Sequence, residues 1–206
     1  MSVGSASCRE LTVDELDILL ELVNIGVGRS AASLSELIGA QIVLHAPSVR
    51  ICTAEDRNQW QQAVADHAST LIVQPFRGPI CGKAGLLFDE QSSLLLAQLL
   101  AGLSDLPDEL DPEMSSTLLE VGNIVLNAVL GSLSNSMHAG LSYSMPTIVS
   151  GRDLTSGDDV LTTSTQGNEL LLADVDFCVA QHEIRGSIII AFALGCVAEL
   201  LDSVGA

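Results

Sequence analysis

The chain repeats part of its own sequence after 99 residues, and this internal repeat limits the possible folds more than any other feature. Residues 19–49 align without a gap on residues 118–148. Two copies of a long repeat are typical of a domain built from two similar halves, whereas a solenoid stacks many shorter units. We therefore predict one domain of two tandem, pseudo-symmetric repeats, at about 11–103 and 111–206, joined by an acidic linker at about 104–110. The identical pairs are Leu19/Leu118, Leu20/Leu119, Glu21/Glu120, Asn24/Asn123, Ile25/Ile124, Ser33/Ser132, Leu34/Leu133, Ser35/Ser134, Ala40/Ala139 and Pro47/Pro146.

Each repeat is predicted to begin with a long helix. Thr12 and Glu15 have the spacing of a capping box, and an aspartate followed by proline at 111–112 is typical of a helix start. Gly39 and Gly140 are predicted to end the two helices. Apolar residues recur every three or four positions along the first helix, so we expect one of its faces to pack on a core. These residues are Leu16, Leu20, Val23, Val27, Leu34 and Ile38.

Strands and a shorter helix are predicted to follow the long helix in each repeat. The segments 41–52 and 141–150 alternate imperfectly between apolar and polar residues, and each contains a proline, which suits the edge or the start of a strand. The segments 82–102 and 186–205 each resemble an apolar strand that leads into a short helix. The expected fold is therefore α+β, with the long helices packed on an antiparallel or mixed β-sheet and the repeats related by a pseudo-two-fold axis.

The first helix contains the pattern Gly26-x-Gly28-x-x-Ala31, which also occurs in dinucleotide-binding turns. That fingerprint requires a strand directly before the glycines and a helix that begins at them. Here the glycines lie about four turns inside a predicted helix, and the second repeat replaces all three small residues with larger ones. We therefore predict that they are mid-helix residues and that they form no phosphate-binding loop.

A polar stripe precedes these glycines. Asp17, Glu21 and Asn24 have spacings of four and three, which bring their side chains within about 60° of one another around the helix. Gly28 continues the stripe one turn later, where the missing side chain would let another protein approach closely. The corresponding residues of the second repeat are Ser116, Glu120, Asn123 and Asn127.

The glutamate and the asparagine of the stripe are kept in both repeats, whereas several neighbours differ. Arg29 aligns with Ala128, and Glu36 aligns with Asn135. On a single helix, glutamate and asparagine are most simply interpreted as solvated surface residues. Their selective retention makes a functional role an equally good interpretation.

The composition argues against nucleic acid and anionic membranes as partners. The chain has 26 Asp and Glu against 8 Lys and Arg, a formal net charge of −18, and such a surface repels polyanions. Its longest apolar stretch, 188–198, is shorter than the roughly 20 residues of a membrane-spanning helix. The five cysteines form no CxxC pair, and Cys52, Cys81, Cys178 and Cys196 lie among apolar residues. We therefore expect a cytoplasmic protein with reduced thiols in its core.

The negative charge is distributed unevenly between the two repeats. Residues 1–103 contain 11 acidic and 6 basic residues, whereas residues 104–206 contain 15 and 2. An acidic partner is therefore expected to dock more readily on the first helix, where Arg29 is near the polar stripe.

The stretches DILLELVN at 17–24 and STLLEVGN at 116–123 resemble the signature of the CheC/CheX/FliY family of chemotaxis phosphatases. That signature is Asp or Ser, three residues, Glu, two residues and Asn, and the resemblance extends over both repeats. Two motifs in one chain favour the CheC-like branch over the CheX-like branch, whose members typically keep one. One departure is Asn127, which stands where the first repeat has Gly28.

The resemblance implies hydrolysis of the aspartyl phosphate of a CheY-type response regulator, which carries its own Mg²⁺ and a lysine beside the phosphate. Asn24 and Asn123 would orient the attacking water, and Glu21 and Glu120 would pair with the regulator's lysine. No cofactor or metal of this protein's own is implied, and its four histidines are too scattered for a zinc site. The implied supporting and partner-binding residues are Asp17, Gly28, Ser116 and Asn127.

Two other functions are compatible with the sequence. The chain could be a binding module with little turnover that docks the receptor deamidase CheD or a flagellar component. It could also be a structural protein whose helix faces have no binding role. Loss of phosphatase activity on replacing both asparagines would separate the first interpretation from these two.

Overall fold

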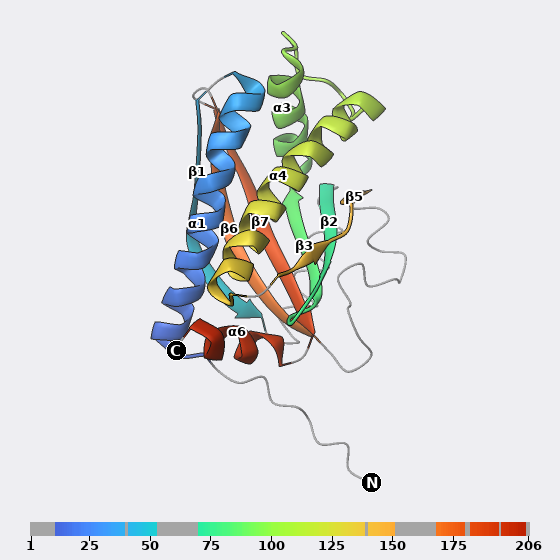
Figure 1. Ribbon diagram of the computed structural model, residues 1–206. Helices are drawn as coiled ribbons and strands as arrows, with labels where there is room; N and C mark the ends of the chain where they lie inside the picture. Colours follow the sequence, from blue (N-terminus) through green and yellow to red (C-terminus); the bar gives the residue numbers. More distant parts are fainter. Residues whose placement is uncertain are drawn as a thin grey trace.

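An antiparallel β-sheet supports the helices of this protein (Figure 1). The computed structural model describes residues 11–39, 41–52, 70–138, 140–150, 168–179, 182–193 and 195–204. Within these ranges the seven-stranded sheet has the order β1-β6-β7-β3-β2-β4, and β5 also pairs with β2. The predicted α+β class, with helices on an antiparallel sheet, is confirmed. The elements are α1 (Val13–Ile38), β1 (Ile42–Cys52), β2 (Thr70–Arg77), β3 (Gly82–Phe88), α3 (Glu90–Ala101), α4 (Pro112–Ser136), β4 (Ser142–Tyr143), β5 (Thr147–Ser150), β6 (Asn168–Val179), β7 (His182–Ala193) and α6 (Cys196–Val204).

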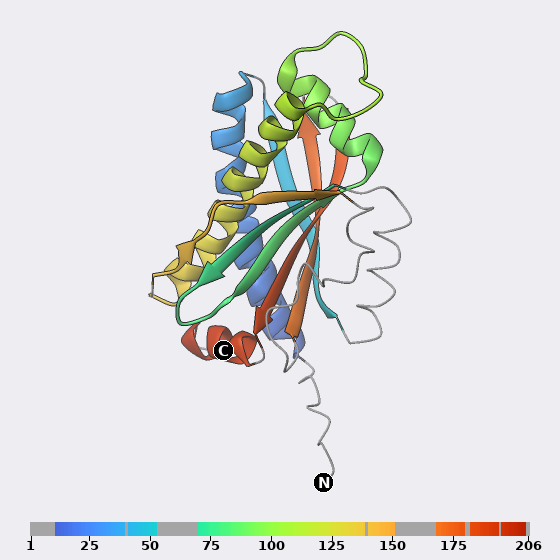
Figure 2. The same ribbon diagram turned by 90° about the vertical axis from the view of Figure 1, so that its right-hand side faces the viewer.

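The two long helices, α1 and α4, lie side by side on one face of the sheet and run in opposite directions (Figures 1 and 2). The shorter α3 packs against α4 at one end of this pair, and α6 lies at the other end. Side chains at the centre of this layer are buried between the helices and the sheet.

The helix starts agree with the capping signals in the sequence. The hydroxyl of Thr12 accepts from the backbone N–H of Glu15 (3.3 Å), and the Glu15 carboxylate accepts from the backbone N–H of Thr12 (2.8 Å). The carboxylate of Asp111 accepts from the backbone N–H of Met114 (2.8 Å). Each contact satisfies an N–H that the helix itself leaves without a partner. Both predicted starts are thus confirmed.

The two predicted helix ends differ in their outcome. Gly39 caps α1 in the left-handed conformation, at φ 68°, as predicted. The predicted stop at Gly140 is wrong, because α4 ends at Ser136 and Met137 is its C-cap residue. The left-handed position that turns the chain away is taken by His138, at φ 53°.

The core lies between the long helices and the sheet. On α1, the predicted face is correct at Val23, Val27 and Leu34, which are buried. Leu20 is partly buried and packs against the core, whereas Leu16 is partly buried and does not belong to the core cluster. The buried face also includes two neighbouring leucines, and the side chain of Ile38 lies outside the described set. The buried leucines concerned are Leu19 and Leu22.

The long helices cross at a glycine. A side chain on Gly26 would place its Cβ 2.4 Å from the Cα of Val129, so only glycine permits this approach of α1 to α4. Near the crossing, the buried Ser132 hydroxyl donates to the carbonyl oxygen of Leu22 (2.6 Å). Gly26 and Gly28 both lie inside α1, as predicted, and Gly26 has a packing role.

The strand order is similar in the two halves of the sheet. The central pair is β3 with β7, and each of these strands is followed by a short helix, α3 or α6. Next to this pair lie β2 and β6, and the edges are formed by β1 on one side and by β4 and β5 on the other. The edge strands at 42–52 and 142–150 have the offset of the sequence repeat. The repeat boundaries themselves stay a prediction.

The prolines lie where the sequence pattern placed them. Pro47 is in the edge strand β1, at an irregularity between His45 and Ser48 where the register with β6 shifts. Pro146 directly precedes β5. Neither position needs a proline N–H for the ladder.

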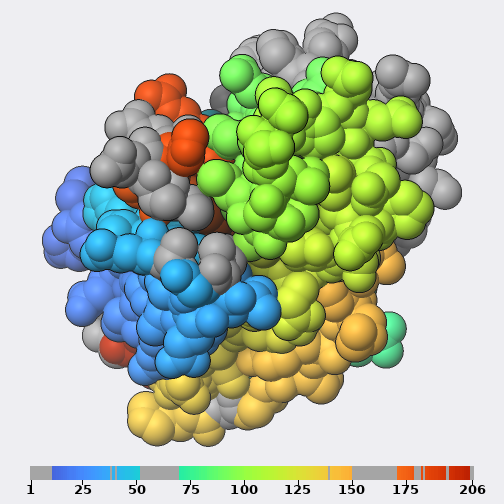
Figure 3. Space-filling view, turned by 90° about the horizontal axis from the view of Figure 1, so that it is seen from above, coloured from blue at the N-terminus to red at the C-terminus, as the bar shows by residue number. Residues whose placement is uncertain are grey.

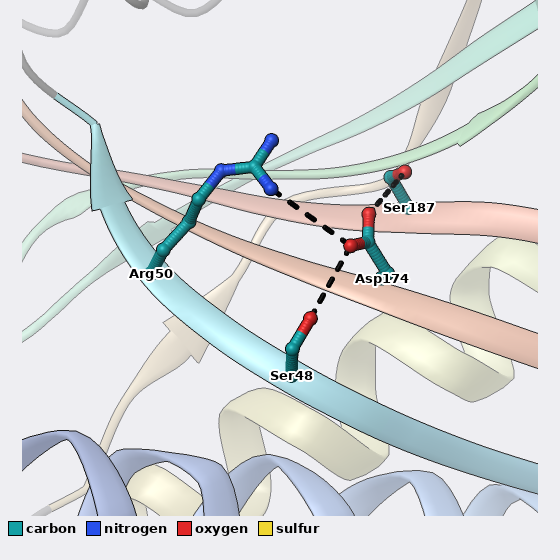
Figure 4. Close-up of polar contacts among 4 residues, drawn as sticks. All are labelled: Ser48, Arg50, Asp174 and Ser187. Atoms are coloured by element: carbon teal, nitrogen blue, oxygen red, sulfur yellow. Dashed lines mark hydrogen bonds and ion pairs between the residues drawn. The ribbon is translucent and has the colours of Figure 1, made fainter.

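The opposite face of the sheet has an apolar part and a polar part. Leu71 and Ile189 belong to a smaller buried cluster there. Toward the β1 edge the face becomes polar, and the exposed carboxylate of Asp174 accepts from the hydroxyl of Ser48 (3.3 Å). Figure 4 shows this group, in which Ser187 also donates to Asp174 (3.4 Å) and Arg50 approaches it at 3.9 Å. These long, exposed contacts contribute little to stability.

In the described part of the chain, α4 is long and apolar enough to cross a membrane, but half of the relevant window is buried inside the protein, so we interpret it as a core helix. The expectation of core cysteines is correct for Cys196 and wrong for Cys81 and Cys178, which are exposed. Cys81 lies just before β3, and Cys178 points outward near the end of β6. The side chain of Cys52 lies outside the described set.

Candidate functional site

The asparagines of the two polar stripes are directed toward different strands of the sheet. Asn24 of α1 faces the edge strand β1, whereas Asn123 of α4 is linked toward β2. Because the helices are antiparallel and each motif precedes the Gly26–Val129 crossing in its own helix, the motifs lie on opposite sides of that crossing. The structure therefore forms two separate candidate sites, which we call the α1 site and the α4 site.

In the α1 site, the amide of Asn24 is bound to the backbone of the sheet. Its Nδ2 donates to the carbonyl oxygen of Ala46 (2.9 Å), and its Oδ1 accepts from the N–H of Ala46 (2.9 Å). Ala46 is fully buried, and it lies in the irregularity where β1 has no register partner on β6. Asn24 therefore takes the place of a strand partner for Ala46. The side of its amide where Nδ2 and Oδ1 point the same way is occupied by these two hydrogen bonds.

In the α4 site, the amide of Asn123 is bound on one side only. Its Oδ1 accepts from Nδ2 of Asn127 (2.8 Å). The Oδ1 of Asn127 in turn accepts from Nε2 of Gln74 on β2 (3.0 Å). Within the described residues, Nδ2 of Asn123 has no hydrogen-bond partner, and the side chain is only half-buried. A carbonyl oxygen can accept two hydrogen bonds, so Asn123 keeps both a donor and an acceptor position.

The difference between the sites follows from two positions in the repeat. Met145 aligns with Ala46 but is 82% exposed, so the α4 site has no buried strand backbone at that position for its asparagine to bind. Asn127 aligns with Gly28, which is exposed and has no atom within 4 Å of the position that a Cβ would take. The amide of Asn127 bridges from the helix toward the sheet, and Asn123 is left free on its outer side.

The glutamates of the two motifs are both exposed. Neither Glu21 nor Glu120 forms a hydrogen bond or an ion pair with another described residue. Asp17 and Ser116, one turn earlier, are exposed as well. Each motif thus presents a carboxylate to an approaching molecule.

An open pocket of about 370 Å³ adjoins the α4 motif. It lies where the ends of α1 and α3 meet the start of α4, the end of the molecule that Figure 3 views. Ser116 and Glu120 line it on the α4 side, and Leu37 and Leu100 provide apolar walls. A partner side chain with an apolar stem and a cationic end would find complementary chemistry here.

One contributor to the α4 site, Gln74, was not among the residues predicted from the sequence. This residue is 1% exposed and lies in the middle of strand β2. A polar residue between the inward-facing Ile72 and Phe76 is the signal that could have identified it. Its contact with Asn127 spans 53 residues, so no local pattern reveals its partner.

Comparison with known proteins gives a result at the level of the fold. The sequence matches no protein-family model and no curated protein. Solved structures do match it over nearly its whole length. FliY of Thermotoga maritima superposes with a TM-score of 0.77 at 19% identity, covering 95% of this chain and 98% of that chain.

Two further structures have the same arrangement. The FliM middle domain of H. pylori matches with a TM-score of 0.64 at 12% identity, covering 94% of this chain and 99% of that one. A chain of the CheX-CheY-BeF3-Mg²⁺ complex of Borrelia burgdorferi matches with a TM-score of 0.53 at 16% identity, covering 84% and 98%. The protein therefore has the fold that is shared by FliY, the FliM middle domain and CheX.

Proposed function

We propose that this protein is a CheC-like phosphatase that hydrolyses the aspartyl phosphate of a CheY-type response regulator. The observation that carries the proposal is the α4 site, where an exposed carboxylate, Glu120, stands one turn from the half-buried Asn123 amide with a free donor. The similar structure from Borrelia burgdorferi is a complex of CheX with CheY, which supports a partner of this kind. The proposed location is the cytoplasm.

The proposed chemistry needs few groups from this protein. Water attacks phosphorus, the bond between phosphorus and the aspartyl oxygen breaks, and the water protons pass to the released phosphate and to solvent. The regulator's Mg²⁺ would neutralise the phosphoryl charge, so the task left is to hold water in line with that bond. Asn123 would bind this water through its free amide positions, and Glu120 would pair with the regulator's lysine.

Charge and geometry favour different sites. The lower negative charge of the first repeat favours docking of an acidic regulator at Glu21. The hydrogen bonds favour the α4 site, because Asn24 is already bound to Ala46. Exposed charges are screened over about 8–10 Å at physiological salt, whereas water must be positioned to within about 1 Å. We therefore propose that the α4 site provides most of the activity.

The test is phosphate release from a phosphorylated CheY-type regulator in the presence of Mg²⁺. We expect Asn123→Ala to lower the rate by roughly 100-fold, the lower end of what one positioned catalytic group contributes, and Asn24→Ala to lower it much less. Asn135→Ala, an exposed asparagine of α4 outside the motif, is the matched control and should keep the full rate. Undiminished activity in the Asn24→Ala/Asn123→Ala double variant would refute the proposal.

A binding role without turnover is the second candidate. It is favoured by the match to the FliM middle domain and to structures of FliM in complexes with FliG and SpeE. A protein of this class would bind CheD or a flagellar component. Stable co-purification with such a partner, together with no effect on the lifetime of the phosphorylated regulator, would support it over the phosphatase.

A further inference from the structure

We propose that Gln74 and Asn127 are positioning residues that set the orientation of the Asn123 amide; this inference rests on the proposed phosphatase function. The three amides form one continuous chain, from Nε2 of Gln74 to Oδ1 of Asn127 (3.0 Å) and from Nδ2 of Asn127 to Oδ1 of Asn123 (2.8 Å). The chain connects the sheet to the exposed flank of α4.

The donor-to-acceptor direction of this chain of amides is fixed at Gln74, its buried end. Nε2 of Gln74 also donates to the carbonyl oxygen of Ser144 (3.0 Å), and a backbone carbonyl oxygen can only accept. The NH₂ group of Gln74 must therefore face Ser144 and Asn127. This requires the oxygen of Asn127 to face Gln74, and the oxygen of Asn123 to face Asn127. The side-chain amide orientations are thus determined by the network, beginning from a backbone group.

The position of Ser144 is itself held by the sheet. Its backbone N–H donates to the carbonyl oxygen of Pro75 on β2 (2.9 Å), next to Gln74 in the same strand. The preceding residue, Tyr143, pairs with Phe76. The carbonyl of Ser144 that orients Gln74 therefore directly follows β4 and is held by a backbone hydrogen bond to β2, so the orientation of Asn123 depends on the backbone of the sheet.

The buried end of this chain of amides, at Gln74, lowers the stability of the fold in a way that packing does not explain. Oε1 of Gln74 is buried without a hydrogen-bond partner, and leaving such an atom unpaired typically costs about 1–3 kcal/mol. An apolar residue at this inward position would avoid that cost. The amide at position 74 is consistent with a residue kept for what its Nε2 group orients.

The consequence for the reaction is that Nδ2 of Asn123, and the second acceptor position of its Oδ1, are held toward the exterior. Without Asn127, the Asn123 amide could rotate or flip and would present the wrong group to water for part of the time. We expect Asn127→Ala to lower the maximal rate of phosphate release by roughly tenfold, given how strongly small misplacements reduce rates. The regulator concentration at half-maximal rate should stay unchanged, because Glu120 is untouched.

The experiment measures the maximal rate and the half-saturating concentration of phosphorylated regulator for Asn127→Ala, Gln74→Leu, Asn123→Ala and the pairwise combinations. If Gln74 acts through Asn127 and Asn127 acts through Asn123, each double variant loses no more than its more severe single variant. Additive losses, or a change confined to half-saturation, would overturn the inference. Melting temperatures within a few degrees of wild type ensure that the comparison concerns folded protein.

Failure of this inference and failure of the proposed function give different results. Full activity in Asn127→Ala combined with loss in Asn123→Ala would refute the positioning network and leave the phosphatase intact. Full activity in the Asn24→Ala/Asn123→Ala double variant would refute the phosphatase mechanism itself. As a conservative variant, Asn127→Asp keeps the acceptor for Gln74 but cannot donate to Asn123. We expect it to lose activity as Asn127→Ala does, and wild-type activity in it would also overturn the inference.

Discussion

Asn24 and Asn123 occupy the same position of a repeated motif, yet their side chains form different hydrogen bonds. Asn24 satisfies both backbone groups of Ala46 in the bulge of β1. Among the described residues, the side chain of Asn123 forms one hydrogen bond, with Asn127. The first is therefore an integral part of the fold, and the second is available at the surface.

This contrast predicts unequal effects on stability. Asn24→Ala would leave the N–H and the carbonyl of the fully buried Ala46 without partners, and each unsatisfied group costs about 1–3 kcal/mol. We expect the free energy of unfolding to fall by at least about 2 kcal/mol. Asn123→Ala removes one half-buried contact and should cost less than about 1 kcal/mol. Urea unfolding of both variants tests this, and equal losses would show that the bulge does not depend on Asn24.

The cysteines give a second prediction at the residue scale. Burial raises the pKa of the Cys196 thiol, an effect larger than that of its neighbour Cys81. Because the thiolate is the reactive form, a raised pKa and burial both slow alkylation. Cys81 and Cys178 are exposed. Mass spectrometry after brief treatment with iodoacetamide at neutral pH should find these two modified before Cys196, and Cys196 modified only in denaturant. Equal labelling of all three in the native protein would contradict the burial of α6.

At the scale of elements, the crossing of α1 and α4 depends on one missing side chain. Gly26→Ala would bring a Cβ to 2.4 Å from the Cα of Val129, a backbone atom that cannot rotate away. Overpacking of this kind typically costs about 1–3 kcal/mol, and we expect that loss in thermal or urea unfolding.

Gly28→Ala is the matched control for this prediction, two residues along the same helix. Its Cβ would meet no atom within 4 Å, and alanine is favoured over glycine inside a helix by up to about 1 kcal/mol. We therefore expect unchanged or slightly higher stability. If both variants lost the same stability, the cause would be a general property of α1, and the close crossing would have no special role.

Local signals predicted the elements well. The capping residues Thr12 and Asp111 act within one helical turn, so their effect can be identified from neighbouring sequence. Gly140 failed as a predicted stop because the chain had already turned, at His138. A non-glycine residue in a left-handed conformation has no reliable signature in sequence.

For the whole molecule, the internal repeat predicted the fold class and the placement of two equivalent helix flanks. It could not predict that the flanks differ chemically. The difference arises from contacts across 22 residues for Asn24 with Ala46, and 53 residues for Asn127 with Gln74. Such contacts depend on the bulge in β1 and on the break between β4 and β5. Repeat sequences that align without a gap can therefore form sites with different hydrogen-bonding capacity.

The bulge in β1 also bears on how this protein behaves at high concentration. β1 is an edge strand of the described sheet and has 11 residues, and a long edge of this kind can recruit strands of other molecules. The irregularity at Ala46 and Pro47 interrupts that edge, and proline offers no N–H to an incoming strand. Asn24 holds Ala46 inward through two hydrogen bonds, so we expect this residue of the motif to maintain the interruption and thereby limit edge-to-edge association.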